Sequence, residues 1–205
     1  MSTTRNIITA LAAAAAAVVA LSGCGSATPS GAGPSAAQSG TAAPQAPEVN
    51  PQGDIPDNQA FVVYTAADRS FTVKYPEGWA QTQSGSTVTF SDKFNSITLA
   101  PHPGFYQPTE AYASSVEVPQ IVSTTTGFVP GKVSTVARPA GKVILITYQA
   151  DSPPSPVTGK SVQQAVERYE FSQSGRGVVA TLAGPVGADN VDPWHIVTDS
   201  VTWLP

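Results

Sequence analysis

The chain has 205 residues, of which 10 are basic and 14 acidic, so its formal net charge is −4 and only 12% of its residues are charged. A chain this sparsely charged lacks the basic patches that attract nucleic acid, and we expect no nucleic-acid partner. It has a single cysteine, which excludes an intramolecular disulfide.

The N-terminus is typical of an exported lipoprotein. A short segment with Arg5 precedes an apolar run that ends in the sequence Leu-Ser-Gly-Cys, whose cysteine is Cys24. The run is about 15 residues long, shorter than the roughly 20 that span a bilayer, and its order is that of a signal peptide. The four residues resemble the bacterial lipobox, in which the cysteine is acylated and the preceding peptide is removed. We predict a lipoprotein signal peptide over residues 1–23 and lipidation of Cys24.

Residues 24–58 are expected to join this anchor to a folded domain. Beyond Cys24 the segment consists mostly of Ala, Gly, Pro, Ser, Thr and Gln, and its only large apolar side chains are Val49 and Ile55. Such a composition buries too little apolar surface to offset the entropy of ordering it, so we predict a disordered tether. Two or more acyl chains anchor a protein stably. We therefore expect the protein to be held at the extracytoplasmic face of the cell membrane.

Residues 59–205 contain every Phe, Tyr and Trp of the chain and are expected to form a single domain. Alternating apolar and polar residues, interrupted by turn residues, indicate strands that pair in sequence. The predicted pairs are residues 61–64 with 70–75, 87–90 with 96–99, 128–136 with 142–149, and 165–171 with 177–182. The charges of Glu167, Arg168 and Glu170 leave a short helix open as the alternative for residues 165–171.

Two helices are expected beside these strands. Thr109 followed by Glu110 predicts a helix start, and Pro119 is expected to end or kink that helix. Its expected buried face consists of Ala111, Tyr112, Ser115 and Val116. Residues 189–201 are expected to form an amphipathic helix with Trp194, Val197 and Val201 on one face. Hairpins and two helices together predict an α+β fold, an antiparallel β-sheet flanked by helices.

Two segments resemble a known family. They are Phe71-Thr-Val-Lys-Tyr-Pro-Glu-Gly-Trp79 and Asp192-Pro-Trp-His-Ile-Val-Thr-Asp-Ser-Val-Thr-Trp203. They are similar to the opening strand and turn and the closing helix of PsbP-like domains, which include the actinobacterial, mycobacterial-type cell-envelope lipoproteins of the LpqN kind. The resemblance implies an antiparallel sheet flanked by helices that serves as a binding or assembly module. It supplies no catalytic residue.

The sequence contains no motif of catalysis or cofactor binding. His102 and His195 each lack a second ligand at metal-binding spacing, and we interpret them as an exposed loop residue and a helix residue. Neither a Gly-x-Ser-x-Gly nor a Ser-x-x-Lys element occurs, although a site assembled from distant residues stays open. We expect no catalytic residue, no metal and no cofactor, and a protein that is not an enzyme.

One loop has the composition of a contact surface. Residues 101–108 are bounded by prolines and include Phe105 and Tyr106, which either are exposed for partner contact or pack over the sheet edge. We therefore expect a membrane-anchored surface lipoprotein that displays a non-catalytic binding or assembly domain to an envelope protein partner. The alternative is a carrier or accessory binding protein for a small apolar ligand or lipid, held in a pocket between the sheet and a helix.

Overall fold

The computed structural model describes residues 53–155 and 157–205. The predicted signal peptide, Cys24 and the tether up to residue 52 lie outside the described residues. Within the described ranges, no helix is both long and apolar enough to span a membrane.

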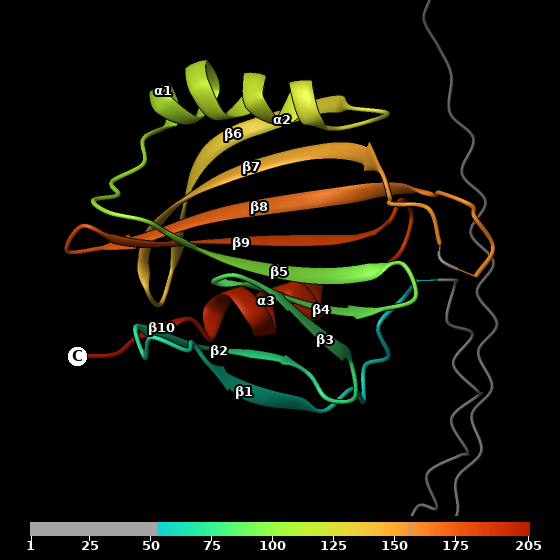
Figure 1. Ribbon diagram of the computed structural model, residues 1–205, viewed down its shortest axis with the longest axis horizontal. Coiled ribbons are helices and arrows are strands. Elements are labelled where there is room, and N and C mark those ends of the chain that lie inside the picture. Colours follow the sequence, from blue (N-terminus) through green and yellow to red (C-terminus); the bar gives the residue numbers. More distant parts are fainter. Residues whose placement is uncertain (1–52, 156) are drawn as a thin grey trace, which may run out of the picture. The chain divides into compact units, whose positions relative to one another are not determined.

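The described strands form two antiparallel sheets (Figure 1). The smaller sheet has the order β1-β2-β10, with β1 at Phe61–Thr65, β2 at Phe71–Pro76 and β10 at Thr202–Trp203. The larger sheet has seven strands in the order β3-β4-β5-β9-β8-β7-β6. Its strands are β3 (Ala80–Ser84), β4 (Thr87–Asp92), β5 (Asn95–His102), β6 (Val129–Arg138), β7 (Gly141–Asp151), β8 (Gln163–Gln173) and β9 (Arg176–Pro185).

Helices cover both faces of the larger sheet. One helical segment consists of α1 (Glu110–Tyr112), the π-helical turn η1 (Ala113–Glu117) and α2 (Val118–Thr124). It lies over the β6 and β7 side of the sheet, whereas α3 (Val191–Asp199) and the smaller sheet lie on the opposite side (Figure 1).

Strand alternation divides the side chains of the larger sheet between these two layers. Tyr169 and Phe171 of β8 enter the main core, which also contains Trp194 and Val197 of α3. The alternate residues of β8 face the α1–α2 segment. On that face Ile144 and Ile146 of β7 pack against Ala113 of η1, beside their register partners Glu170 and Arg168.

Most of the predicted elements are confirmed. All four predicted strand pairs are present, and antiparallel sheets with helices confirm the α+β class. Strand β8 pairs with both β7 and β9, so the short-helix alternative for residues 165–171 is wrong. Helix α3 buries Trp194 and Val197 as predicted, and Val201 follows it in the core.

Two details of the predicted elements are wrong. Strand β3 was not predicted, because its polar side chains carry no apolar alternation; it is a fully exposed edge strand. The predicted buried face of the first helix is also wrong, since Ala111, Tyr112 and Ser115 are exposed. Ala113 and Glu117 are buried instead. The helical segment does not end at Pro119 but continues to Thr124, and the π-helical turn η1 lies directly before this proline.

The folded part begins before residue 59, the predicted boundary. Ile55 is 4% exposed and belongs to the main core. Its amide donates to Asn190 Oδ1 at 2.9 Å, and the Gly53 carbonyl accepts from Asn95 Nδ2 at 2.8 Å. Residues 53–58 are therefore part of the domain and not of the tether. Burial of Ile55 and its hydrogen bond to Asn190 order this segment although its other residues are mostly polar.

Replacing Ile55 tests this boundary. Ile55→Ala is expected to lower the free energy of unfolding by about 2–5 kcal/mol, because it leaves a cavity in the core. Ile196→Ala is the matched control, since Ile196 is 43% exposed, and its expected change is within about 0.5 kcal/mol. Urea denaturation of both variants measures the difference. Equal effects at the two positions would contradict a domain that begins before residue 59.

Candidate functional site

The loop between β5 and α1 carries the two aromatic residues whose placement the sequence left open. Tyr106 is 4% exposed, whereas Phe105 is 78% exposed. The Tyr106 amide donates to the Gly175 carbonyl at 2.8 Å, which fixes the loop against the turn between β8 and β9. Each of the two alternatives therefore holds for one residue: Tyr106 packs inward and Phe105 projects outward.

Tyr106 is held between two residues of neighbouring strands. Its ring stacks on the His102 ring, with centroids 4.0 Å apart and planes 18° apart. A Cβ at Gly177 would collide with the Tyr106 ring, so the close approach requires glycine there. His102 pairs with Gly177 at the end of β5 and is half-buried, which shows that its expected role as an exposed loop residue is wrong.

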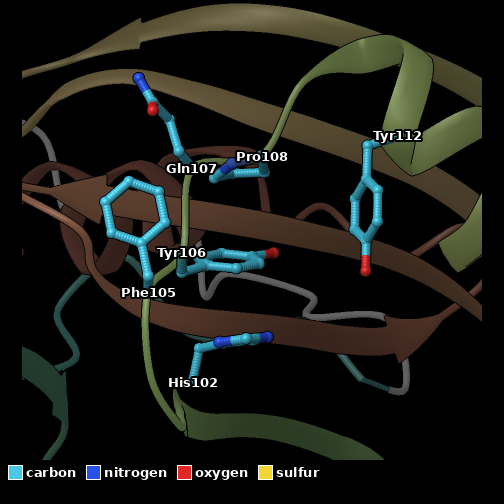
Figure 2. A pocket seen from close by; sticks show the side chains of 6 residues that line it. All are labelled: His102, Phe105, Tyr106, Gln107, Pro108 and Tyr112. Carbon is cyan, nitrogen blue, oxygen red and sulfur yellow. The ribbon is translucent and has the colours of Figure 1, made fainter.

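A surface cavity of about 350 Å³ opens beside this stacked pair. It is lined by His102, Phe105, Tyr106, Gln107, Pro108 and Tyr112 (Figure 2). We call it the aromatic cavity. Tyr112, which comes from α1, is 44% exposed. Phe105 also lines a second cavity of about 450 Å³, whose lining includes Arg176 and Trp203.

A network of buried charges lies behind the aromatic cavity. The Tyr106 hydroxyl donates to Glu117 Oε1 at 3.2 Å. Arg168 of β8 places its guanidinium 3.6 Å from Glu117 Oε2 and 3.3 Å from Glu170 Oε1. Glu117 is 7% exposed and Glu170 is fully buried. The network links the loop, the helical segment and the centre of the larger sheet.

This network contains two carboxyl groups and one guanidinium. With both carboxyl groups ionised, the three side chains have a formal charge of −1. The second oxygens of Glu117 and Glu170 are buried and, among the described residues, accept no hydrogen bond. Burying ions away from water is costly unless they are fully paired. The network is therefore incompletely paired within the part of the chain that the structure describes.

Two buried tyrosines have altered acidity. Burial, together with the charge of Glu117, raises the pKa of the Tyr106 hydroxyl well above its usual value of 10.0. Burial and the hydrogen bond to Glu167 raise the pKa of Tyr169 to about 12. The Tyr169 hydroxyl donates to Glu167 Oε2 at 2.7 Å and accepts from Arg138 at 3.1 Å. Both phenols therefore remain protonated in the folded state well above neutral pH.

A larger surface cavity, of about 500 Å³, lies near the end of α2 and the start of β8. Its lining combines apolar side chains of the sheet with polar residues that follow α2. The apolar group includes Tyr148, Ala150, Val166 and Ala183. Only Thr124, the last residue of α2, contributes to it from a helix, so the cavity lies beside the end of that helix.

The other residues considered from the sequence do not converge. His195 is exposed on α3, and Asp199 pairs with Arg138 at 3.4 Å. Asp189 and Asp192 line a small cavity of about 160 Å³ near the start of α3. Within residues 53–155 and 157–205, no group of three or more His, Cys, Asp or Glu is arranged to hold a metal ion.

The buried network was missed by the sequence analysis. Its only signal was the presence of Arg168 and Glu170 within an apolar strand, which was interpreted as a possible helix face. Glu117 is distant in sequence from both, and a lone acidic residue in a short helix normally faces solvent. The network could therefore be found only once the register of β8 and the helix placement were known.

Comparisons with known proteins give a distant structural likeness. No protein family model matches the chain, and no curated protein matches it. A solved protein of unknown function from Pseudomonas aeruginosa, described as a putative regulator, is 12% identical with a TM-score of 0.46; the match covers 71% of this chain and 98% of that one. A protein from Bacteroides thetaiotaomicron is 9% identical with a TM-score of 0.44, over 70% of this chain and 48% of that one.

The raised tyrosine pKa values predict a loss of stability in alkali. The folded protein keeps both phenolic protons at pH values where the unfolded chain loses them, so the free energy of unfolding falls as pH rises from 10.0 towards 12. Below pH 10.0 these groups are neutral in both states and contribute no slope. Denaturant unfolding at several pH values measures the slope. The double variant Tyr106→Phe/Tyr169→Phe should have a shallower slope, and an unchanged slope would contradict the assignment.

Proposed function

We propose that this chain is a lipid-anchored envelope protein whose domain binds a partner and does not catalyse a reaction. The anchor is the acylated Cys24 at the extracytoplasmic face of the cell membrane, and the binding surface is the aromatic cavity with its flanking residues. The proposal includes kinship with PsbP-like domains of the LpqN kind, which rests on the two sequence segments and is compatible with the α+β class.

The observation that carries the proposal is the outward position of Phe105. It is 78% exposed, although the adjacent Tyr106 is held by a backbone hydrogen bond and a buried carboxylate. An exposed aromatic side chain on a loop that is fixed at its neighbour loses little conformational entropy when a partner covers it. Aromatic residues are also enriched at the energetic centres of protein interfaces.

The proposed lipid anchor predicts in which cell fraction the protein is found. The full-length chain is expected in the membrane fraction of its natural host. A Cys24→Ser variant exported behind a signal peptide that is cleaved without lipidation is expected in the aqueous fraction, because it cannot accept the acyl chains that hold the protein. Mass spectrometry of the mature N-terminus supplies the second readout. An unmodified Cys24, or membrane retention of the Cys24→Ser variant through another part of the chain, would contradict the anchor.

The binding surface predicts site-specific crosslinking. A photoreactive benzoylphenylalanine placed at Phe105 of the full-length, membrane-bound chain should form one discrete adduct on illumination. The same group placed at the exposed Ile196 of α3 is the control and should not form that adduct. Adding Tyr112→Ala should weaken the adduct, because Tyr112 lines the same cavity. The same adduct at both positions, or none at Phe105, would refute the surface.

The carrier function remains the second candidate. The observation that favours it is the 500 Å³ cavity whose lining includes Tyr148, Val166 and Ala183, a volume within the range of about 300–1,000 Å³ found for small-molecule sites. An apolar molecule that copurifies with the full chain in native mass spectra, and is lost on Ala183→Phe, would favour this candidate over partner binding.

A further inference from the structure

We infer that the aromatic cavity recognises an organic ammonium group, with a quaternary ammonium as the preferred form. The inference rests on the proposed function, because it names the chemistry that enters the proposed binding surface. It follows from three features of the cavity: accessible aromatic rings, a lining without lysine or arginine, and a glutamate side chain behind the wall.

The first feature is the arrangement of the rings. The stacked His102–Tyr106 pair lies between Phe105 and Tyr112, and the Tyr112 side chain extends from the helix towards that pair (Figure 2). Phe105 and Tyr112 are the two exposed aromatic members of the lining, at 78% and 44%. A cation within about 6 Å of an aromatic ring face is attracted by its quadrupole. The cavity therefore offers a cation the accessible rings of Phe105 and Tyr112 on either side of the stacked pair.

The second feature is the chemistry of the lining. Its six residues include no lysine, arginine or carboxylate, so a ligand meets aromatic surface, an amide, a proline ring and a phenol. Such a wall neither repels a cation nor pairs with it directly. A strongly hydrated cation would lose its water without compensation there, whereas a methylated ammonium has little hydration to lose. The lining therefore favours a quaternary ammonium over a metal ion or a primary amine.

The third feature is the charge behind the wall. Tyr106 separates the cavity from Glu117, and it donates its hydroxyl hydrogen to that carboxylate. Among the described residues, Glu117 and Glu170 form ion pairs with Arg168 alone, so with both carboxyl groups ionised this buried layer carries a charge of −1. A neutral apolar ligand gains nothing from this charge. An organic cation gains from it without touching it, and this difference separates the inference from simple apolar binding.

The neighbouring cavity provides an internal contrast. The cavity of about 450 Å³, which shares His102 and Phe105 with the aromatic cavity, includes Arg176, whose guanidinium lies 5.7 Å from the Trp203 ring centroid. A cation already occupies the aromatic face there. The aromatic cavity has the same kind of ring surface without such an occupant in its lining.

The test compares two ligands of equal shape and different charge. Choline and its neutral isostere 3,3-dimethylbutan-1-ol are titrated into the full chain in detergent by calorimetry or by NMR of the aromatic resonances. Choline is expected to bind about tenfold more tightly than the isostere, and N-acetyl-lysine amide, which presents a primary ammonium, is expected to bind more weakly than choline. Equal binding of choline and the isostere would overturn the inference, and so would an absence of choline binding.

Three variants separate the contributions. Tyr112→Phe keeps the ring and should retain choline binding, whereas Tyr112→Leu should weaken it about fivefold to tenfold. Glu117→Gln keeps an acceptor for the Tyr106 hydroxyl but removes the charge, so it should weaken choline and leave the isostere unchanged. Thermal unfolding establishes that each variant is folded. The comparison of choline with the isostere uses the wild-type chain, so it tests the inference even if a variant does not fold. If the photoreactive group at Phe105 forms its adduct but choline binds no more tightly than the isostere, the proposed partner binding stands and the ammonium specificity alone is refuted.

Discussion

The arrangement of the domain depends on one guanidinium. Arg168 lies in the middle of β8, the strand between β7 and β9 in the larger sheet, and it contacts Glu170 of its own strand and Glu117 of the helical segment. Removing one partner of a buried ion pair typically costs about 3–5 kcal/mol, because the other charge is left uncompensated. The helical segment is short and irregular, and the apolar residues of its contact with the sheet are few. The charges therefore determine how the segment docks as much as apolar packing does.

The loop follows from that docking. Glu117 accepts the hydrogen bond of the Tyr106 hydroxyl, while the Tyr106 backbone is tied to Gly175. A residue held at both its backbone and the tip of its side chain has one orientation. Its neighbour Phe105 lines the same cavity and is 78% exposed. The fixed Tyr106 therefore places an exposed aromatic ring beside the cavity.

The sequence predicted those strands whose own apolar residues reveal their buried positions. Strands β2, β4 and β5 were found because apolar residues recur with a period of two along them. Strands β7 and β9 have nearly continuous apolar runs, which are typical of strands covered on both faces. Strand β3 has no buried face: its five residues are all exposed and it pairs only through its backbone. Ile55 was assigned to the tether because its neighbours are polar, although the core and Asn190 hold it. In each case the deciding contact comes from a distant part of the chain.

The buried face of the helix was missed for a related reason. The predicted face included Tyr112 and Val116, whereas Ala113 and Glu117 are the residues that are buried. Apolar periodicity assigns a glutamate to the solvent side, and only the position of Arg168 reverses that assignment. In the π-helical turn the backbone hydrogen bonds join residues five apart in place of four. The residues after this turn therefore lie on a different face of the helix from the one that a regular α-helix would give them. A charged residue inside and an aromatic residue outside is the kind of local inconsistency that functional surfaces show.

The geometry also bears on how an anchored domain could reach a partner. The Gly53 carbonyl is bound by Asn95, the first residue of β5, whereas His102 is the last residue of that strand and lines the aromatic cavity. Seven residue steps along a strand correspond to roughly 23 Å. The chain preceding the domain therefore joins it at one end of β5, and the candidate site lies at the other end. Asn95 and Asn190 both bind the Gly53 carbonyl, and Asn190 also accepts from the Ile55 amide. The first described residues of the chain are therefore fixed by side chains at one end of β5, whereas the loop that positions Phe105 follows the other end of that strand.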